Sequence, residues 1–138
     1  MIILDTTVIS ELMHAVPDPK VVAWIDRQAG DSIWISSITI FEVTFGLEIM
    51  TAGSKQGSLR RSFMELRSKL RDRIAFFDER AAEKTAELMA TRQRSGTPRD
   101  LRDSMIAGIV LARRATIATR NVTHFADISA NIVNPWVL

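Results

Sequence analysis

The sequence predicts a three-layer α/β/α fold, in which helices cover both faces of a parallel sheet of four to five strands. Short apolar runs that suit buried strands alternate along the chain with longer stretches of helical periodicity. No two of these runs are joined by a hairpin turn, so the strands are expected to connect through helices and to run parallel. Several runs end on a small polar or acidic residue, at the position where open α/β sheets bind ligands.

The first half of the chain contains two of the expected strands. Asp18 is expected to cap a helix that has Pro19 at its first position, because both residue types favour a helix start. Glycine and polar residues at 52–57 predict a flexible break. The expected elements are a strand at 1–4, helices at 7–14 and from Pro19 towards Gly30, a strand at 33–35, a helix at 38–51 and a helix whose apolar side holds Leu59, Phe63, Leu66 and Leu70.

The second half repeats this alternation. Asp78 is expected to cap an alanine-rich helix that ends at Arg94, before a loop at 95–98. The other expected elements are strands at 74–77, 115–119 and 132–133, a helix at 101–113 and a polar turn at 120–126. Residues 1–138 are expected to form a single domain.

Composition narrows the class of protein. Hydrophobic residues make up 46% of the 138 residues and charged residues 25%, which is ordinary for a soluble globular protein. The absence of cysteine excludes a disulfide, a thiolate zinc site and a cysteine nucleophile. Asp5 interrupts the N-terminal apolar run, and the longest later run, 105–112, is far shorter than the ~20 residues that span a bilayer. We therefore expect a cytoplasmic protein without a membrane segment.

Arginine dominates the basic residues. The net charge is only +2, yet 14 of the 18 basic side chains are arginine, whose planar fork suits phosphate better than the lysine ammonium does. Two interpretations stay open. One is a nucleic-acid partner, and the other is a solvated helix surface on which arginines pair with acids such as Glu65 and Asp72.

Three acidic residues lie where a charge needs an explanation. Asp5 directly follows the first strand, and Glu42 lies on a helix that is apolar nearly all round, where a lone charge is costly. Asp103 lies in the first turn of a helix for which Asp100 is better placed as the cap. The open alternatives are an ion pair between Glu42 and an arginine such as Arg120, and a capping role for Asp103.

The helix that carries Glu42 also raises two questions of packing. Gly46 lies on the same stripe as Glu42 and is expected to leave room for the close approach of a neighbour. The apolar residues whose role stays open between core packing and a surface for a second copy or another protein partner are Leu47, Met50, Phe63 and Met64.

Convergence of the three acids at the strand ends would require a cation. Carboxylates at ~4 Å and an effective dielectric of ~20 repel each other by up to ~4 kcal/mol per pair. Oxygen ligands suit Mg²⁺ or Mn²⁺, whereas the lack of cysteine and of paired histidine argues against structural zinc. His14 and His124 are isolated and are interpreted as structural or surface residues.

Four blocks of the sequence together resemble PIN-domain ribonucleases, above all the VapC-type toxins of bacterial toxin–antitoxin pairs and their FitB-like branch. The blocks are residues 4–10, 38–43, 103–107 and 119–125, and residues 21–26 and 134–136 are similar to the FitB-like branch. The resemblance extends over nearly the whole chain, and it implies the PIN-like form of the α/β/α fold.

The resemblance implies a Mg²⁺-dependent endoribonuclease, with Mn²⁺ as a substitute, that cuts tRNA or another structured RNA and stops translation. It also implies a homodimer held inactive by a small VapB-like antitoxin, whose C-terminal segment fills the active-site groove. The family's first three acids correspond to Asp5, Glu42 and Asp103, and its fourth position, often Asp, falls on Asn121. Thr7 replaces the usual Asn or Ser and His124 replaces an acid, which weakens the case for a second metal.

On this hypothesis Asp5 and Asp103 hold the metal, and Glu42 orients the water that attacks the phosphodiester. Asn121 joins these acids as a candidate catalytic residue, although a turn-forming role for it stays open. The residues expected to position ligand waters, the scissile phosphate or the RNA backbone are Thr6, Thr119, Asn121, Arg99, Arg102 and Arg120.

Two further classes of protein follow from the same residues. A catalytically impaired PIN-like module that binds nucleic acid or antitoxin stays open, because Asn121 adds no charge. A phosphatase of the aspartyl-phosphate type would need a second Asp where the chain has Thr7. A P-loop nucleotide site is excluded, since no glycine-rich loop ends in Gly-Lys-Ser or Gly-Lys-Thr.

Overall fold

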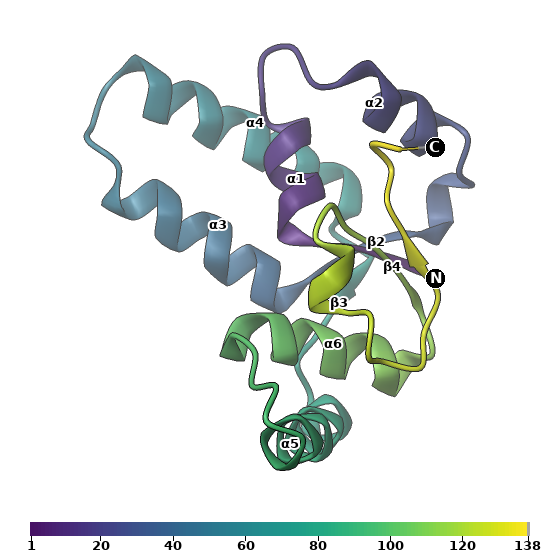
Figure 1. The fold of residues 1–138 in the computed structure, drawn as a ribbon. Coiled ribbons are helices and arrows are strands. Elements are labelled where there is room, and N and C mark those ends of the chain that lie inside the picture. Colours follow the sequence, from purple (N-terminus) through teal and green to yellow (C-terminus); the bar gives the residue numbers. More distant parts are fainter. Residues whose placement is uncertain (138) are drawn as a thin grey trace.

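A computed structural model describes residues 1–137 and confirms the predicted fold class. Five parallel strands form one sheet in the order β3-β2-β1-β4-β5, with helices on both of its faces (Figure 1). The strands are β1 (Ile2–Leu4), β2 (Ile33–Ser36), β3 (Ile74–Ala75), β4 (Thr116–Ala118) and β5 (Ile132–Val133). The helices are α1 (Thr6–Leu12), α2 (Pro19–Asp26), α3 (Ser37–Ile49), α4 (Ser54–Leu70), α5 (Glu79–Arg94) and α6 (Leu101–Arg113), together with the 3₁₀ turns η1 (Gly30–Ser32) and η2 (Val122–His124).

Each face of the sheet has its own hydrophobic core, because alternate strand residues point to opposite sides. On one face, Leu4 packs with side chains of the first four helices, among them Trp24 and Phe63. On the other face, Ile3 packs with α5 and α6, where Ile106 is fully buried. Burial of each such side chain contributes about 1.5–3 kcal/mol, so the two cores hold the helices against the sheet.

The strand register brings distant residues together at one end of the sheet. Leu4 of β1 pairs with Ile35 of β2 on one side and with Ala118 of β4 on the other. The residues that follow these strands, Asp5 and Thr119 among them, therefore meet at the carboxyl edge. The chain builds β2 and β3 on one side of β1 before it returns to β4 on the other. The edge beside β1 and β4 is thus a topological switch point, where open α/β sheets bind ligands.

Side-chain caps begin the helices where the sequence predicts them. Asp18 accepts a hydrogen bond from the N–H of Lys20 at 2.9 Å and starts α2. Asp78 accepts one from the N–H of Ala81 at 2.9 Å and starts α5. Each cap satisfies one of the N–H groups that a helix start leaves without a partner.

The predicted break at 52–57 is wrong in its extent, because α4 already begins at Ser54. The side chain of Gln56, in the first turn of α4, donates hydrogen bonds to the carbonyl oxygens of Leu47 (2.7 Å) and Met50 (3.4 Å) at the end of α3. This tie between consecutive helices is a tertiary contact, which composition does not reveal. The strand expected at 74–77 is also shorter, and Phe76 is 58% exposed.

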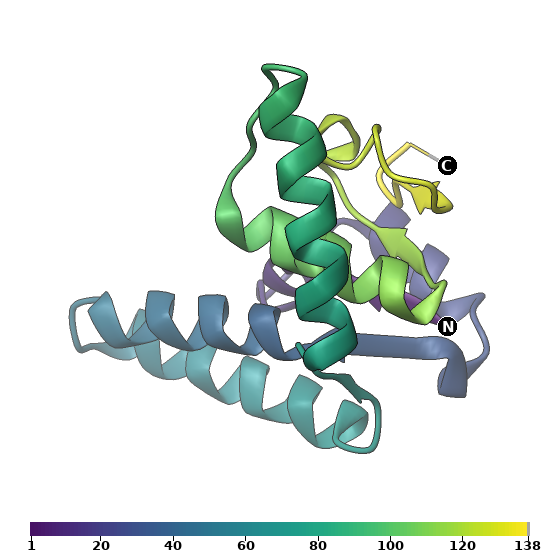
Figure 2. The ribbon, with the colours of Figure 1, turned by 90° about the horizontal axis from the view of Figure 1, so that it is seen from below.

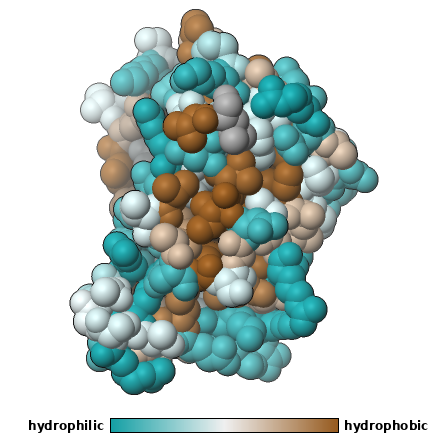
Figure 3. Space-filling view, turned by 45° about the vertical axis from the view of Figure 1, so that its right-hand side comes forward, coloured by the Kyte–Doolittle hydropathy of each residue, from teal (hydrophilic) through white to brown (hydrophobic). Residues whose placement is uncertain are grey.

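Helices α3 and α4 lie side by side as a hairpin that extends beyond the sheet (Figures 1 and 2). Leu47 and Phe63 are buried, Met50 is half-buried against the core and Met64 is exposed, so most of the apolar surface that the sequence left open is core. A separate apolar strip crosses the side of the molecule that carries the termini (Figure 3). None of the helices within residues 1–137 has the length and apolar character needed to cross a membrane.

Gly108, and not Gly46, is the glycine that allows a close approach. A Cβ atom at Gly46 would have no neighbour within 4 Å, so the expectation of close packing there is wrong. A Cβ atom at Gly108 would collide with Oγ1 of Thr85 and lie 2.8 Å from the carbonyl oxygen of Ala81. Gly108 therefore lets α6, which carries Asp103, pack directly against α5.

We expect Gly108→Ala to destabilise the protein by about 1–3 kcal/mol, because the α5 backbone would have to move away from the added methyl group. Gly46→Ala is the matched control, and it should be neutral or stabilising by up to about 1 kcal/mol through helix propensity. Urea unfolding of both variants measures the difference. Equal stability of the two would contradict the packing described here.

Candidate active site

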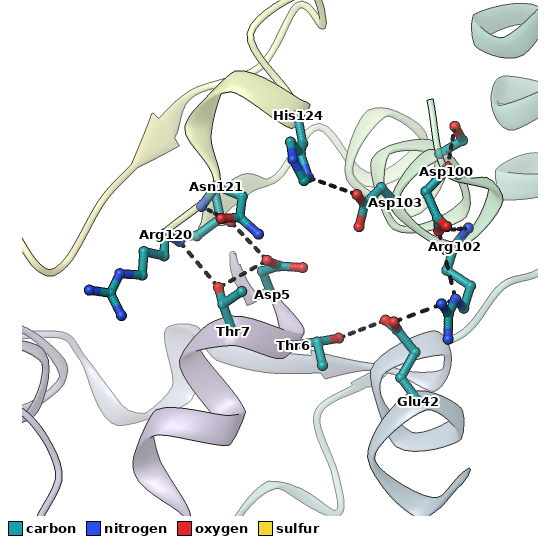
Figure 4. A network of polar contacts seen from close by, with 12 residues as sticks. Asp5, Thr6, Thr7, Glu42, Asp100, Arg102, Asp103, Arg120, Asn121 and His124 are labelled. Atoms are coloured by element: carbon teal, nitrogen blue, oxygen red, sulfur yellow. Dashed lines mark hydrogen bonds and ion pairs between the residues drawn. The ribbon is translucent and has the colours of Figure 1, made fainter. Parts of the chain in front are cut away.

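Three acidic side chains from separate parts of the chain face a common gap at the carboxyl edge of the sheet (Figure 4). Asp5 follows β1 and precedes α1, Glu42 lies in the second turn of α3, and Asp103 lies in the first turn of α6. The sequence predicts this convergence from the ends of the strands and helices. The environment of each acid differs, and the differences decide what the site can do.

Burial raises the pKa of the Asp5 carboxyl group, which is only 3% exposed, above its ordinary value. Hydrogen bonds oppose this effect, because Oδ2 accepts from Oγ1 of Thr119 at 2.8 Å and from Oγ1 of Thr7 at 3.0 Å. The negative charge of Asp103 raises the pKa further. A buried carboxylate that hydrogen bonds compensate only in part favours a cation beside it.

Burial also raises the pKa of Glu42, whereas two contacts lower it. Oε1 accepts a hydrogen bond from Oγ1 of Thr6 at 2.8 Å, and Oε2 lies 3.8 Å from Nε of Arg102. The charges of the other two acids raise the pKa again. The arginine beside Glu42 is thus Arg102 and not Arg120. The pair is long and Arg102 is 46% exposed, so it neutralises Glu42 only in part.

Asp103 is paired with a histidine. Its Oδ2 lies 2.8 Å from Nδ1 of His124, which projects from η2 (Figure 4). The interpretation of His124 as an isolated residue is therefore wrong. Asp100 caps α6, because its Oδ1 accepts a hydrogen bond from the N–H of Arg102 at 2.9 Å. The cap frees Asp103 for the shared gap, as the sequence predicts.

Of the other residues expected to contact water, phosphate or RNA, Asn121 is connected to the acids through Thr119, whereas the side chains of Arg120 and Arg99 are not. The N–H of Asn121 donates to Oγ1 of Thr119 at 3.0 Å, which ties the loop after β4 to the hydroxyl that holds Asp5. The guanidinium of Arg120 lies 5.1 Å from the centre of the Trp136 ring and points away from the acids (Figure 4). Arg99 lies on the exposed loop before α6.

The oxygen atoms that face the gap suit a hard divalent cation. Within residues 1–137, no three His, Cys, Asp or Glu side chains form a group that could hold a metal ion by themselves. Mg²⁺, however, usually keeps several waters and takes only one or two carboxylates from a protein. Asp5 and Asp103 fit that requirement, and Glu42 would be left to contact a water.

Sequence reasoning missed Arg92, a charged side chain that is 1% exposed. Its Nε and Nη2 donate to the two carboxylate oxygens of Asp127, both at 2.8 Å. Nη1 donates to Oγ of Ser104 at 3.0 Å, and Nη2 also donates to the carbonyl oxygen of His124 at 3.1 Å. Arg92 therefore joins α5, α6 and the loop that carries Asn121 and His124.

The helical spacing of α5 offered a signal for this role. Ala81, Thr85 and Leu88 form the side of α5 that packs on α6, and Arg92 continues the same stripe. An arginine on an inward stripe needs a buried acceptor, because a guanidinium always carries charge. Sequence alone does not show that Asp127 and the η2 loop supply the acceptors.

We expect Asp127→Ala to destabilise the protein by about 2 kcal/mol at neutral pH, because the buried guanidinium loses its charged acceptor. The hydrogen bonds from Arg92 hold the pKa of Asp127 below its ordinary value. Its contribution is therefore present above the ordinary carboxyl pKa and is lost as the pH falls through the lowered value. Thermal unfolding from pH 7 to pH 2 should show the two proteins converging, whereas a constant difference would contradict the assignment.

Comparison with known proteins identifies the family. The family model described as PIN domain matches residues 2–131. A protein from Sinorhizobium fredii named VapC ribonuclease Y4jK is 39% identical over 99% of this chain and 98% of its own length. A protein from Neisseria gonorrhoeae named Toxin FitB is 31% identical over 99% of both chains.

A solved structure agrees with these relatives. The crystal structure of FitAcB from Neisseria gonorrhoeae contains a chain that superposes on this one with a TM-score of 0.90 and 31% identity, and the match covers 100% of both chains. Sequence, fold and the position of the acids thus lead to one conclusion. This protein belongs to the PIN-domain family, as the four sequence blocks predict.

Proposed function

We propose that the protein is the toxin of a type II toxin–antitoxin pair and acts as a metal-dependent endoribonuclease that hydrolyses phosphodiester bonds of RNA. The relatives named VapC ribonuclease and Toxin FitB support both parts of this proposal. A structured RNA such as tRNA is the proposed target, and its cleavage would stop translation in the cytoplasm.

The observation that carries the proposal is the buried carboxylate of Asp5, which faces Asp103 and Glu42 at the switch point of the sheet. Burial and the charge of Asp103 both raise the pKa of Asp5, so the ionised carboxylate of Asp5 destabilises the folded chain. A divalent cation beside Asp5 would offset this destabilisation by its attraction to the carboxylate. Strands that only needed to pack would not require an acid at this position.

Asp5 and Asp103 are the proposed ligands of Mg²⁺, for which Mn²⁺ is an expected substitute. When bound, the metal would neutralise the charge that develops on the phosphate during in-line displacement. Thr119 and Thr7 hold Oδ2 of Asp5 in place, so its orientation does not depend on the metal. Side chains that fix a metal ligand in this way usually matter for affinity.

Glu42 is the proposed acceptor of the proton that the attacking water releases. Its pKa is raised by burial, so its carboxylate takes up a proton more readily than an ordinary glutamate. Thr6 donates to Oε1 and Arg102 lies 3.8 Å from Oε2, so the two contacts orient the carboxylate and offset part of the rise in its pKa. Arg102, Arg99 and Arg120 are the proposed contacts to the bound RNA strand, and Asn121 is the proposed contact to a water or to the phosphate.

We also propose a homodimer that is inhibited by a VapB-like antitoxin. Phe41 and Phe45 of α3 are 55% and 49% exposed, and with Leu101 they line an apolar pocket of about 550 Å³ beside Arg102. An exposed apolar surface of this kind is typical of a protein–protein contact. Its position next to the acids suits a partner that blocks the active site.

A catalytically impaired binding module is the second candidate. It is favoured by the contact between His124 and Asp103, which occupies one carboxylate oxygen, and by Asn121, which contributes no charge. Metal titration separates the two candidates. The module predicts no affinity for Mg²⁺ or Mn²⁺ at millimolar concentrations.

The nuclease predicts that purified protein with Mg²⁺ cuts RNA and that the cleavage rate of Asp103→Asn is lower by at least about 100-fold. Loss of a group that only supports a metal ligand already costs up to about that factor. Asp100→Asn is the matched control, because asparagine caps a helix as well as aspartate does. The rate at which RNA fragments appear is measured for both variants, and sequencing of the fragment ends checks that the cuts are at the same positions. Cleavage by Asp103→Asn at the parent rate would refute the site.

Asp5→Asn should raise the thermal stability of the metal-free protein at pH 8. A raised pKa means that the parent loses stability as the pH rises from the ordinary value of 3.8 through the folded value, and asparagine does not ionise. The gain should vanish near pH 3. Mg²⁺ should then stabilise the parent but not the variant. A variant that is less stable than the parent at pH 8 without metal would contradict the charge argument.

A further inference from the structure

A pocket of about 290 Å³ is lined by Thr6 and Thr7, whose hydroxyl groups donate hydrogen bonds to Glu42 and Asp5. We call it the side pocket. Its lining includes the side chains of Thr7, Ser10, Glu11, His14, Arg120 and Trp136. Helix α1 provides one wall, and the end of the chain with the loop after β4 provides the other.

Thr7 connects the side pocket to the acids. Its Oγ1 donates a hydrogen bond to Oδ2 of Asp5 at 3.0 Å and accepts one from the N–H of Arg120 at 3.2 Å. One residue thus separates the pocket from the carboxylate that is proposed to hold the metal. A group bound in the pocket would adjoin whatever is bound at Asp5.

Arg120 and Trp136 form a flat wall of the pocket. The guanidinium lies 5.1 Å from the centre of the indole ring, and Trp136 is only 8% exposed, which anchors it in the core. The backbone N–H of Trp136 also donates a hydrogen bond to Oδ1 of Asn134 at 3.0 Å. Arg120 is exposed, so its outer side is available to a ligand.

The opposite wall presents groups that can form hydrogen bonds. Ser10 is exposed on α1, and its hydroxyl can donate or accept. Oε2 of Glu11 accepts a hydrogen bond from the N–H of Asp18 at 3.0 Å and lies 3.3 Å from Nδ1 of His14. These contacts hold Glu11 in place while its carboxylate lines the pocket.

We infer that the side pocket binds the base of an unpaired RNA nucleotide next to the scissile phosphate, an inference that rests on the proposed function. The base stacks on the guanidinium plane of Arg120, and Ser10 and Glu11 contact its edge. A base inside a duplex cannot enter such a pocket. The pocket therefore sets a preference for one base beside the cut.

Filling the pocket tests this inference. Ser10→Leu adds an apolar side chain at an exposed position of α1, and Ser68→Leu is the matched control at an exposed position of α4. The substrate is a hairpin RNA with a randomised loop, cut in the presence of Mg²⁺. Ser10→Leu should abolish the base preference next to the cut and raise KM by roughly tenfold, the scale of one lost base stack, while kcat changes little. Ser68→Leu should cut as the parent does.

A second measurement does not depend on cleavage. The indole N–H resonance of Trp136 is followed by NMR in metal-free protein during addition of each of the four nucleoside 5′-monophosphates. The resonance should shift in the parent and not in Ser10→Leu, and Arg120→Lys should bind less tightly, because lysine keeps the charge but cannot stack.

The outcomes separate the two proposals. A parent protein that fails to cut RNA but shows the resonance shift refutes the nuclease, and the subsite beside a scissile phosphate with it, and leaves a nucleotide-binding pocket. A parent that cuts RNA with a base preference that Ser10→Leu leaves unchanged refutes the pocket while the nuclease stands. Binding of mononucleotides together with an unchanged cleavage pattern assigns the pocket to free nucleotides and overturns the RNA subsite.

Discussion

The site depends on the pairing of β1 with a parallel neighbour on each side. Because Leu4 is in register with Ile35 and Ala118, the chain immediately beyond β1 has nowhere to lie except between two other strand ends. The N–H of Asp5 is fixed by a hydrogen bond to the carbonyl oxygen of Ala118 at 2.9 Å. Its side chain is therefore buried by the backbone geometry of the sheet, whatever its charge.

Asp5 differs from the other two acids because no basic side chain within residues 1–137 pairs with its buried carboxylate. Glu42 has Arg102 at 3.8 Å and Asp103 has His124 at 2.8 Å, whereas the contacts of Asp5 within residues 1–137 are hydrogen bonds from neutral groups. A cation placed at Asp5 would balance the most deeply buried of the three acids. The partial pairing of the other two acids leaves the gap accessible to water, since the side chains of Glu42 and Asp103 keep 17% and 24% of their exposure.

The fold could be predicted in most of its elements because local physics decides them. The bounds of α6 and β5 agree with the sequence prediction, and the caps at Asp18 and Asp78 are formed as expected, since caps and periodicity act within a few residues. The start of α4 and the role of Gly108 could not be predicted. Gln56 reaches back to α3, and Gly108 meets α5, so both features depend on which helices pack together.

The sequence by itself determined the fold class and the positions of Asp5, Glu42 and Asp103 at strand ends and helix starts, because both follow from hydrophobic period and capping residues. The family followed separately, from the resemblance of the four blocks. Only the tertiary structure decided which basic side chain stands beside which acid or aromatic ring. It set Arg102 against Glu42, His124 against Asp103 and Arg120 over Trp136, and it buried Arg92 between α5, α6 and the η2 loop. The reason is physical: long side chains reach across several ångströms, so their partners depend on how helices and loops cross in space, which local sequence does not specify.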